Sequence, residues 1–408
     1  MFAQDLVDEG VERVLERSQD AGANSVTVAA SYHHGRDVFP HNPRHRVVFH
    51  EGGVVYFHPD LGRYDQTSLK PKVAAIAVAS DPMAEVVEEA ARRDMGVSAW
   101  TVFLHNSRLG LLHPECTISN AFGDRLIHYL CPANPDVISY AAGLATDIAR
   151  YGVRSIAFEA LSYLPFDHGY HHERNFLRLS PTVRYLLGLC FCSHCLAAAG
   201  ALGVDGNRVR SRVRELIDGV SESAANDIWE EDVQGQAIRA EAGGELGGYL
   251  DAREATVTAI VREVATAVRR EAPGVKTVFL DLSGGVLGYA DGKPRTDATS
   301  TSIAWRDGVS MQAVAAECDG IGVLGYFAAI DRFVRELAAY REVVPSPHTL
   351  EVLLRPMMPD TGSADELAAK VTALIDLGEI DISFYHYGFM RLESLAWIRA
   401  ALPRLQGS

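Results

Sequence analysis

The chain lacks any hydrophobic run long enough to cross a membrane, because no segment approaches the roughly 18 to 20 consecutive apolar residues that a transmembrane helix needs. Residues 1–20 are charged and helical in pattern, without the basic start and apolar centre of a signal peptide. Positive charge is also scarce: 38 Lys and Arg stand against 53 Asp and Glu, for a net charge of −15. Nucleic acid is also negatively charged, so this net negative charge would repel it. We therefore expect a cytoplasmic protein with no nucleic-acid or membrane partner.

Internal repeats and low-complexity tracts are absent too, and no Gly-x-Gly-x-x-Gly of a dinucleotide-binding fold follows the first predicted strand. What the sequence does contain is alternation, in which short apolar or β-branched runs are separated by longer segments with helical spacing. Its 408 residues suit one barrel of about 250 residues with insertions. Apolar residues make up 48% of the chain, which is enough for a large core.

Eight runs are predicted strands, and their alternation with helices indicates a parallel sheet. The strands are expected at 25–30, 45–58 (which also reads as a hairpin turning at Gly52-Gly53), 97–104, 155–160, 276–283, 320–326, 348–355 and 381–387. Helices are expected at 3–20, 82–95, 135–151, 254–271, 330–342, 363–377 and 391–402. An open doubly wound sheet fits the same alternation, but a count of eight favours a barrel. We expect a single α/β domain over 1–408, a (β/α)8 TIM barrel with a helical insertion after strand four at 161–253.

In such a barrel, functional side chains gather just after the C-terminal ends of the strands. Histidines and tyrosines predominate at those positions, and they suit a polar, hydroxyl-rich ligand that can hydrogen-bond and stack. The predicted partner is therefore a small-molecule carbohydrate, and a homo-oligomer is left open. The predicted substrate-binding residues are Tyr32, His33, His34, His105, Asn106, His171, Tyr326, Arg355, Tyr385 and His386.

Three carboxylates are candidates for catalysis. Glu159 ends the fourth strand in an apolar context, where burial raises a carboxyl pKa and favours a general acid; the alternative is a structural Glu paired with an Arg or a backbone amide. Asp281 holds the same place on the next strand, with capping of the following turn as its alternative. Glu351 lies early in the seventh strand on the same face as Arg355, and a buried pair between those two is its alternative.

The cysteines carry the most specific pattern. Cys190, Cys192 and Cys195 form C-x-C-x-x-C, and Cys131 lies upstream. Disulfides are a poor explanation in a reducing compartment, whereas four thiolates can close a tetrahedral structural zinc site with Zn–S near about 2.3 Å. Buried free thiols are the alternative.

The segment 131–135 (Cys-Pro-Ala-Asn-Pro), the strand that ends in Glu159 and the C-x-C-x-x-C together resemble the family 42 β-galactosidases, over roughly residues 95–200. The resemblance implies a (β/α)8 barrel, zinc bound by Cys131, Cys190, Cys192 and Cys195, and Glu159 as the acid/base. Phe158 stands where that family has an Asn that grips the sugar 2-hydroxyl. Arg355-Pro356 stands where it has its nucleophilic Glu, so Asp281 and Glu351 are both candidates for the second carboxylate.

The predicted function is a glycoside hydrolase that acts on a small glycoside or oligosaccharide by two-carboxylate acid/base chemistry. The alternative is a barrel that binds carbohydrate without hydrolysing it, or a non-hydrolytic sugar-modifying enzyme. Two carboxylates about 5–5.5 Å apart would indicate retention of anomeric configuration, and about 6.5–9.5 Å would indicate inversion.

Overall fold

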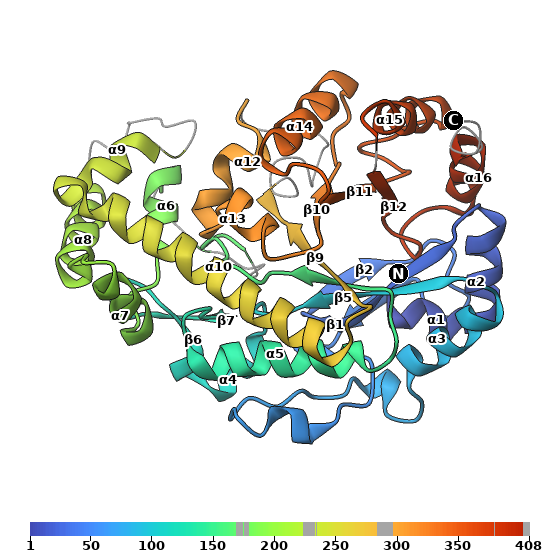
Figure 1. The fold of residues 1–408 in the computed structure, drawn as a ribbon, viewed down its shortest axis with the longest axis horizontal. Coiled ribbons are helices and arrows are strands. Elements are labelled where there is room, and N and C mark those ends of the chain that lie inside the picture. Colours follow the sequence, from blue (N-terminus) through green and yellow to red (C-terminus); the bar gives the residue numbers. More distant parts are fainter. Residues whose placement is uncertain are drawn as a thin grey trace.

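The computed structural model describes residues 1–168, 174, 179–222, 233, 235–283, 297–378 and 380–402 (Figure 1). Its centre is an eight-stranded sheet in the order β12-β11-β10-β9-β8-β5-β1-β4. All neighbours pair in parallel except β4, which runs antiparallel to β1. The strands are β1 (Ser25–Tyr32), β4 (Val54–Val55), β5 (Gly96–Val102), β8 (Ser155–Glu159), β9 (Lys276–Asp281), β10 (Gly320–Leu324), β11 (Thr349–Leu354) and β12 (Ile380–Phe384).

Seven of the predicted strands are present as parallel strands, and the prediction for 45–58 is wrong. Within that range β3 (Val47–His50) pairs antiparallel with β2 (Gly35–Val38), and only the two residues of β4 join the main sheet. The side chains of Val47 and Phe49 are 49% and 73% exposed, so the apolar run belongs to a surface ribbon. Hydrophobicity alone does not distinguish such a ribbon from a buried strand.

The order of the parallel strands follows the chain without a reversal, so this sheet has no topological switch point of the doubly wound kind. The sheet is curled. The ring of Phe2 lies 4.7 Å from that of Tyr32 on β1 and 4.5 Å from that of His386, just beyond β12. A single buried aromatic side chain therefore bridges the β1 and β12 sides of the sheet.

Helices alternate with the strands, and several begin where capping chemistry predicts. Asp81 accepts a hydrogen bond from the Ala84 amide ahead of α3, Asn134 caps α5 and Ser363 caps α15. The alternating helices are α1 (Ala3–Glu9), α2 (Val11–Asp20), α3 (Pro82–Arg92), α5 (Pro135–Ala149), α10 (Glu245–Glu271), α14 (Ile330–Val343), α15 (Ala364–Asp376) and α16 (Leu392–Ala401).

Two helix predictions need correction. The predicted helix 3–20 is interrupted at Gly10, whose φ of +93° is incompatible with a right-handed helix. The predicted helix 254–271 begins earlier, at Glu245, and packs along α5. Its first turns fall inside the range 161–253, which the sequence assigns to an insertion.

The segment after β8 forms a separate group of helices. These are α6 (Pro181–Leu187), α7 (Ser193–Ala201), α8 (Gly206–Glu222) and α9 (Gly235–Ala240), and they gather round the N-terminal half of α10 at the left of Figure 1. They enclose a second apolar core that includes Leu186, Val213 and Tyr249. After β5 come α4 (Ser107–Leu112) and the hairpin of β6 (Thr117–Ser119) and β7 (Arg125–Leu130); α12 (Ser300–Ile303) and α13 (Met311–Ala315) precede β10. In the ranges that the structure covers, no helix combines the length and the apolar character needed to span a membrane.

The burial of Phe158 and the exposure of Phe49 predict that the same change, Phe to Ala, has very different effects on stability at the two positions. Phe158 on β8 is fully buried and its ring contacts that of Phe103 edge-on at 5.3 Å, whereas Phe49 is 73% exposed. We expect Phe158→Ala to lower the free energy of unfolding by about 3–5 kcal/mol, because it leaves a cavity. Phe49→Ala should change it by less than about 0.5 kcal/mol. Urea unfolding followed by circular dichroism measures both, and equal effects would contradict this assignment of the core.

Candidate functional site

A cavity of about 940 Å³ runs through the interior of the sheet, from residues at the C-terminal ends of the strands, such as His33 and Tyr385, to residues at the N-terminal ends, such as Asn24 and Arg154. Barrel interiors are usually filled by bulky branched side chains. Here several inward positions are small: Ser98 on β5, Ser155 and Ala157 on β8, and Gly322 on β10 all line the cavity. Most of the residues predicted from the sequence also line it, namely Tyr32, His33, His34, His105, Glu159, Tyr326, Glu351, Tyr385 and His386.

Glu159 is the last residue of β8 and faces this cavity. The indole Nε1 of Trp100, on the neighbouring strand β5, donates a hydrogen bond to its Oε2. Burial raises the pKa of Glu159 to about 7, while the bond from Trp100 acts in the opposite direction. A carboxyl with that pKa is partly protonated near neutral pH, as a proton donor must be. Among the described residues, the hydrogen-bond partner of the Glu159 carboxyl is this indole, and not the Arg or backbone amide that the structural alternative expected.

A histidine wall, composed of His33, His34, His105 and His168, forms one side of the cavity. The rings of His33 and His105 stack with centroids 4.2 Å apart, and the ring of His168 meets that of His105 edge-on at 4.9 Å. Burial lowers the pKa of His33 to about 4 and lowers that of His105 further. Both imidazoles are therefore neutral at pH 7, so they present hydrogen-bonding groups without charge.

Aromatic side chains face the cavity from other strands. Tyr385 follows β12, and its ring lies 5.8 Å from that of Tyr326 and 5.9 Å from that of Trp100. His386 accepts a hydrogen bond at Nδ1 from the Gly388 amide, which places the proton of the neutral ring on Nε2. These rings provide apolar faces and a few polar atoms, a combination typical of small-molecule binding sites.

The other two candidate carboxylates lie apart from Glu159. Asp281, 2% exposed, does not line the cavity; it accepts hydrogen bonds from the Tyr340 hydroxyl and, at 3.1 Å, from the Ser283 amide. Those bonds favour a structural role. Glu351 is the third residue of β11, so it lies toward the N-terminal ends of the strands, where it accepts a hydrogen bond from Ser383 at 2.7 Å.

Two predicted contact residues are engaged elsewhere. Asn106 caps α4 by accepting a hydrogen bond from the Leu109 amide at 2.9 Å. Arg355 forms an ion pair with Asp360, and its guanidinium lies 4.3 Å from the centroid of the Tyr326 ring. The predicted buried pair of Glu351 and Arg355 is therefore wrong: the extended strand separates the two side chains, and each has its own partner. His171 falls outside the described residues.

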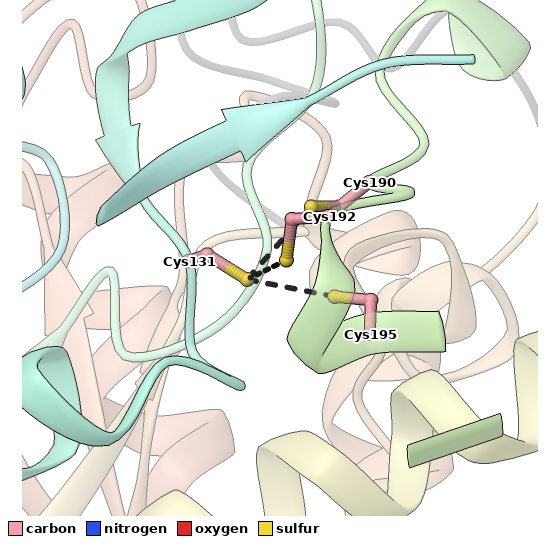
Figure 2. A group of neighbouring side chains, drawn as sticks. All are labelled: Cys131, Cys190, Cys192 and Cys195. Carbon is pink, nitrogen blue, oxygen red and sulfur yellow. Dashed lines mark hydrogen bonds between the residues drawn. The ribbon is translucent and has the colours of Figure 1, made fainter. Parts of the chain in front are cut away.

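The four cysteines of the sequence pattern come together in the structure (Figure 2). Cys131 follows β7, while Cys190, Cys192 and Cys195 lie at the start of α7, and all four are buried. The Sγ of Cys131 lies 3.8, 3.6 and 3.5 Å from those of Cys190, Cys192 and Cys195. A tetrahedron with Zn–S of about 2.3 Å has sulfurs about 3.8 Å apart. The cluster therefore has the dimensions of a four-thiolate metal site.

The surroundings of the cysteines connect this cluster to the cavity wall. The Tyr163 hydroxyl lies 3.2 Å from the Sγ of Cys195, and the Ser119 amide donates to the Sγ of Cys190 at 3.4 Å. Tyr163 follows Glu159 by four residues. The cluster thus joins the β6–β7 hairpin, the start of α7 and the segment that leaves β8.

Several residues that line the cavity escape the sequence reasoning, Trp100 and Asp307 among them. Trp100 is the inward neighbour of Glu159, and strand alternation could have indicated it. Asp307 lies at the end of a short helical turn, Ala304–Asp307, before β10. No strand end or motif marks that position, so only the folded chain reveals it.

No protein-family model matches the sequence, and no curated protein matches it. Solved structures do match. An α-L-fucosidase from Paenibacillus thiaminolyticus is 12% identical with a TM-score of 0.56, over 97% of this chain and 46% of that one. A β-galactosidase from Marinomonas ef1 is 10% identical with a TM-score of 0.54, over 100% of this chain and 58% of that one. Gan42B, a GH42 β-galactosidase, is 11% identical with a TM-score of 0.55, over 100% of this chain and 56% of that one.

The chain shares the fold of the family 42 β-galactosidases. At these identities the likeness concerns the fold, and it extends over nearly the whole chain. The chain spans about half the length of the solved structures that it matches. The architectural part of the sequence prediction, a TIM-barrel-like α/β fold, is therefore confirmed. The place of an insertion within it stays a prediction.

The raised pKa of Glu159 predicts a pH-dependent stability. In the native state the carboxyl stays protonated up to about pH 7, whereas in the unfolded chain it ionises near its usual value of 4.5. Between those values the unfolded chain loses the proton first, so the free energy of unfolding should fall as the pH rises. Relative to Glu159→Gln, we expect the wild type to lose about 1–3 kcal/mol from pH 4.5 to 8. Urea unfolding at both pH values measures this difference, and a constant difference would contradict the burial of this carboxyl.

Proposed function

We propose that this protein hydrolyses a small glycoside in the cavity, with Glu159 as the general acid. The observation that carries the proposal is a cavity-facing carboxyl whose pKa is raised to about 7 at the end of β8. The acid needs to be protonated when the glycosidic oxygen leaves, and a pKa near the working pH makes that possible.

Two further features support a sugar as the ligand. The histidine wall is uncharged at neutral pH, and together with Tyr326 and Tyr385 it offers hydrogen bonds and ring faces to a neutral, hydroxyl-rich molecule. The solved structures of similar fold carry the names β-galactosidase and α-L-fucosidase. Fold likeness alone does not imply function, so the site has to supply the argument.

Sugar binding without hydrolysis is the second candidate. It is favoured by one observation: neither Asp281, held by Tyr340, nor Glu351, held by Ser383, adjoins Glu159 as a partner. A screen of aryl glycosides separates the two candidates, because binding without release of the aryl alcohol supports only the second.

Removal of the proton at Glu159 tests the first candidate directly. Glu159→Gln preserves the shape and eliminates the acid, so turnover of glycosides with poor leaving groups should fall by about 10²–10⁴. Activated aryl glycosides, whose leaving group needs less protonation, should be affected less. The matched control is Glu263→Gln on the exposed face of α10, which should leave both rates unchanged. Turnover of Glu159→Gln within a few-fold of wild type on every substrate would refute the role.

We further propose that the cysteine cluster holds one structural zinc ion. All four positions of a tetrahedral site are filled by Cys131, Cys190, Cys192 and Cys195, which leaves no open position for a substrate. The ion would cross-link the segments round the cavity wall. It would also keep the four sulfurs as thiolates in a buried place where the hydrogen bonds that the Cys131 thiol donates to the other three sulfurs raise its pKa.

The metal content of purified protein tests this second proposal. We expect about one zinc per chain by elemental analysis of protein prepared without chelator. Cys195→Ala should lose most of the metal and melt at a lower temperature, because binding contributes to folding. Cys318→Ala, which removes a buried thiol outside the cluster, should keep its zinc. Equal zinc in the two variants would place the metal elsewhere.

A further inference from the structure

The loop between β2 and β3 carries His41 into a nearly closed space. The side chain of His41 is 7% exposed, and it contacts Glu9 at the end of α1 and Tyr387 just beyond β12. A buried histidine is usually neutral, because removal from water disfavours its charged form. The two partners of this ring have the opposite effect.

The partners of His41 require a proton on each of its ring nitrogens. Nε2 lies 2.8 Å from the carbonyl oxygen of Tyr387, and a carbonyl can only accept, so Nε2 carries a proton. Nδ1 lies 3.0 Å from Oε1 of Glu9. A bare Nδ1 would turn its lone pair toward that carboxylate, whereas a protonated one forms an ion pair with it. Burial lowers the pKa of His41, but these two contacts act against burial and leave the pKa raised.

The carboxylate of Glu9 joins His41 to two other elements. Its side chain is 1% exposed, and Oε2 accepts a hydrogen bond from the Tyr387 hydroxyl at 2.9 Å and pairs with Arg17 on α2. Tyr387 therefore meets this pair twice, through its carbonyl oxygen at His41 and through its hydroxyl at Glu9. The segment after β12 is bound to α1 and to the β2–β3 loop at one point.

Two more titratable groups face His41. Asp5 lies one turn before Glu9 on α1; its charge favours the imidazolium, and burial raises its own pKa to about 7. His386 lies beside Tyr387, and burial lowers its pKa well below the usual value, so it is neutral. Asp5 thus gains its charge in the pH range in which a histidine of raised pKa loses its own.

The β2–β3 loop has a second attachment to α1. Asp8 accepts hydrogen bonds from Asn42 and from His45, each at 2.9 Å. This attachment holds the loop on α1, and His41 extends the connection to the segment after β12.

Both segments that His41 joins border the cavity. The residues directly before the loop line it from one side, and the residues after β12 line it from another: His33, His34, Gly35, Arg36 and Asp37, and Tyr385, His386 and Tyr387. The histidine wall and the aromatic side chains of the β12 end therefore share one point of attachment.

We propose that His41 is a positioning residue that acts as a pH-dependent latch. Its imidazolium ties the β2–β3 loop to the segment after β12, and loss of a proton from Nδ1 to solvent removes the ion pair and loosens this part of the cavity wall. Such a latch acts on any ligand of the cavity, whether or not the ligand is hydrolysed.

The direction of the pH effect follows from the raised pKa of His41. The latch is complete below 6.5, the usual pKa of histidine, and it weakens as the pH rises through the higher pKa of the folded protein. Rising pH should therefore loosen the two segments.

Hydrogen–deuterium exchange of the whole protein, read by mass spectrometry, tests the latch. Protection from exchange in peptides that cover residues 33–46 and 385–390 should fall by about 3- to 30-fold from pH 6 to pH 9, after correction for the intrinsic rates. His41→Gln cannot carry the charge, so it should show the weaker protection already at pH 6 and little further change. Asp5 titrates in both proteins, so the pH dependence that disappears in His41→Gln belongs to His41.

The matched control is His348→Gln, in the loop before β11. In the part of the chain that the structure describes, the His348 side chain makes no hydrogen bond or ion pair, so this variant should follow the wild type at every pH. An equal fall in protection in the wild type and His41→Gln would overturn the latch.

A variant that keeps the charge covers the case in which His41→Gln does not fold. His41→Lys stays cationic at pH 9, so its protection there should remain within about threefold of its value at pH 6. A fall as large as that of the wild type would overturn the latch. None of these measurements uses a glycoside, so failure to find a hydrolysed substrate would overturn the proposed function and leave the latch standing.

Discussion

Parallel strands in a curled sheet all point their C-terminal ends to the same edge, and every feature of the candidate site depends on this constraint. Trp100 and Glu159 lie on the neighbouring strands β5 and β8, so an indole can donate to a carboxyl that would otherwise be buried without a partner. Burial then raises the pKa of this carboxyl, so the position of Glu159 in the sheet determines its protonation near neutral pH. The same constraint brings His33, at the end of β1, and Tyr385, after β12, to the same cavity.

The cavity has space for a ligand because several inward-facing residues of the strands are small. Ser98, Ser155, Ala157 and Gly322 occupy inward positions where bulky residues would close the interior. The cavity consequently reaches below Glu159, as far as Glu351 and Asp381 near the other ends of the strands. Polar groups at both ends of the cavity and aromatic rings near the C-terminal ends of the strands make it suitable for a polar ligand.

The cysteine cluster lies behind the cavity wall and carries part of its support. Tyr163 contacts Cys195 through its hydroxyl, Arg253 through its ring face and the Asp307 carbonyl through its amide. One residue therefore connects a candidate metal site to the segment that follows Glu159 and to the turn that ends at Asp307. A structural metal with no open coordination position would hold these two segments in place.

The sequence by itself determined the alternation of strands and helices, the place of Glu159 at a strand end and the four cysteines, because periodicity, capping and spacing are local properties that short segments display. It misassigned 45–58, since an exposed ribbon and a buried strand have the same apolar composition. Asp307 and the partners of Asp281, Glu351 and Arg355 were decided only by the tertiary structure. Those contacts join residues on different elements or depend on the path of a loop, and which side chains meet there follows from packing that no local pattern encodes.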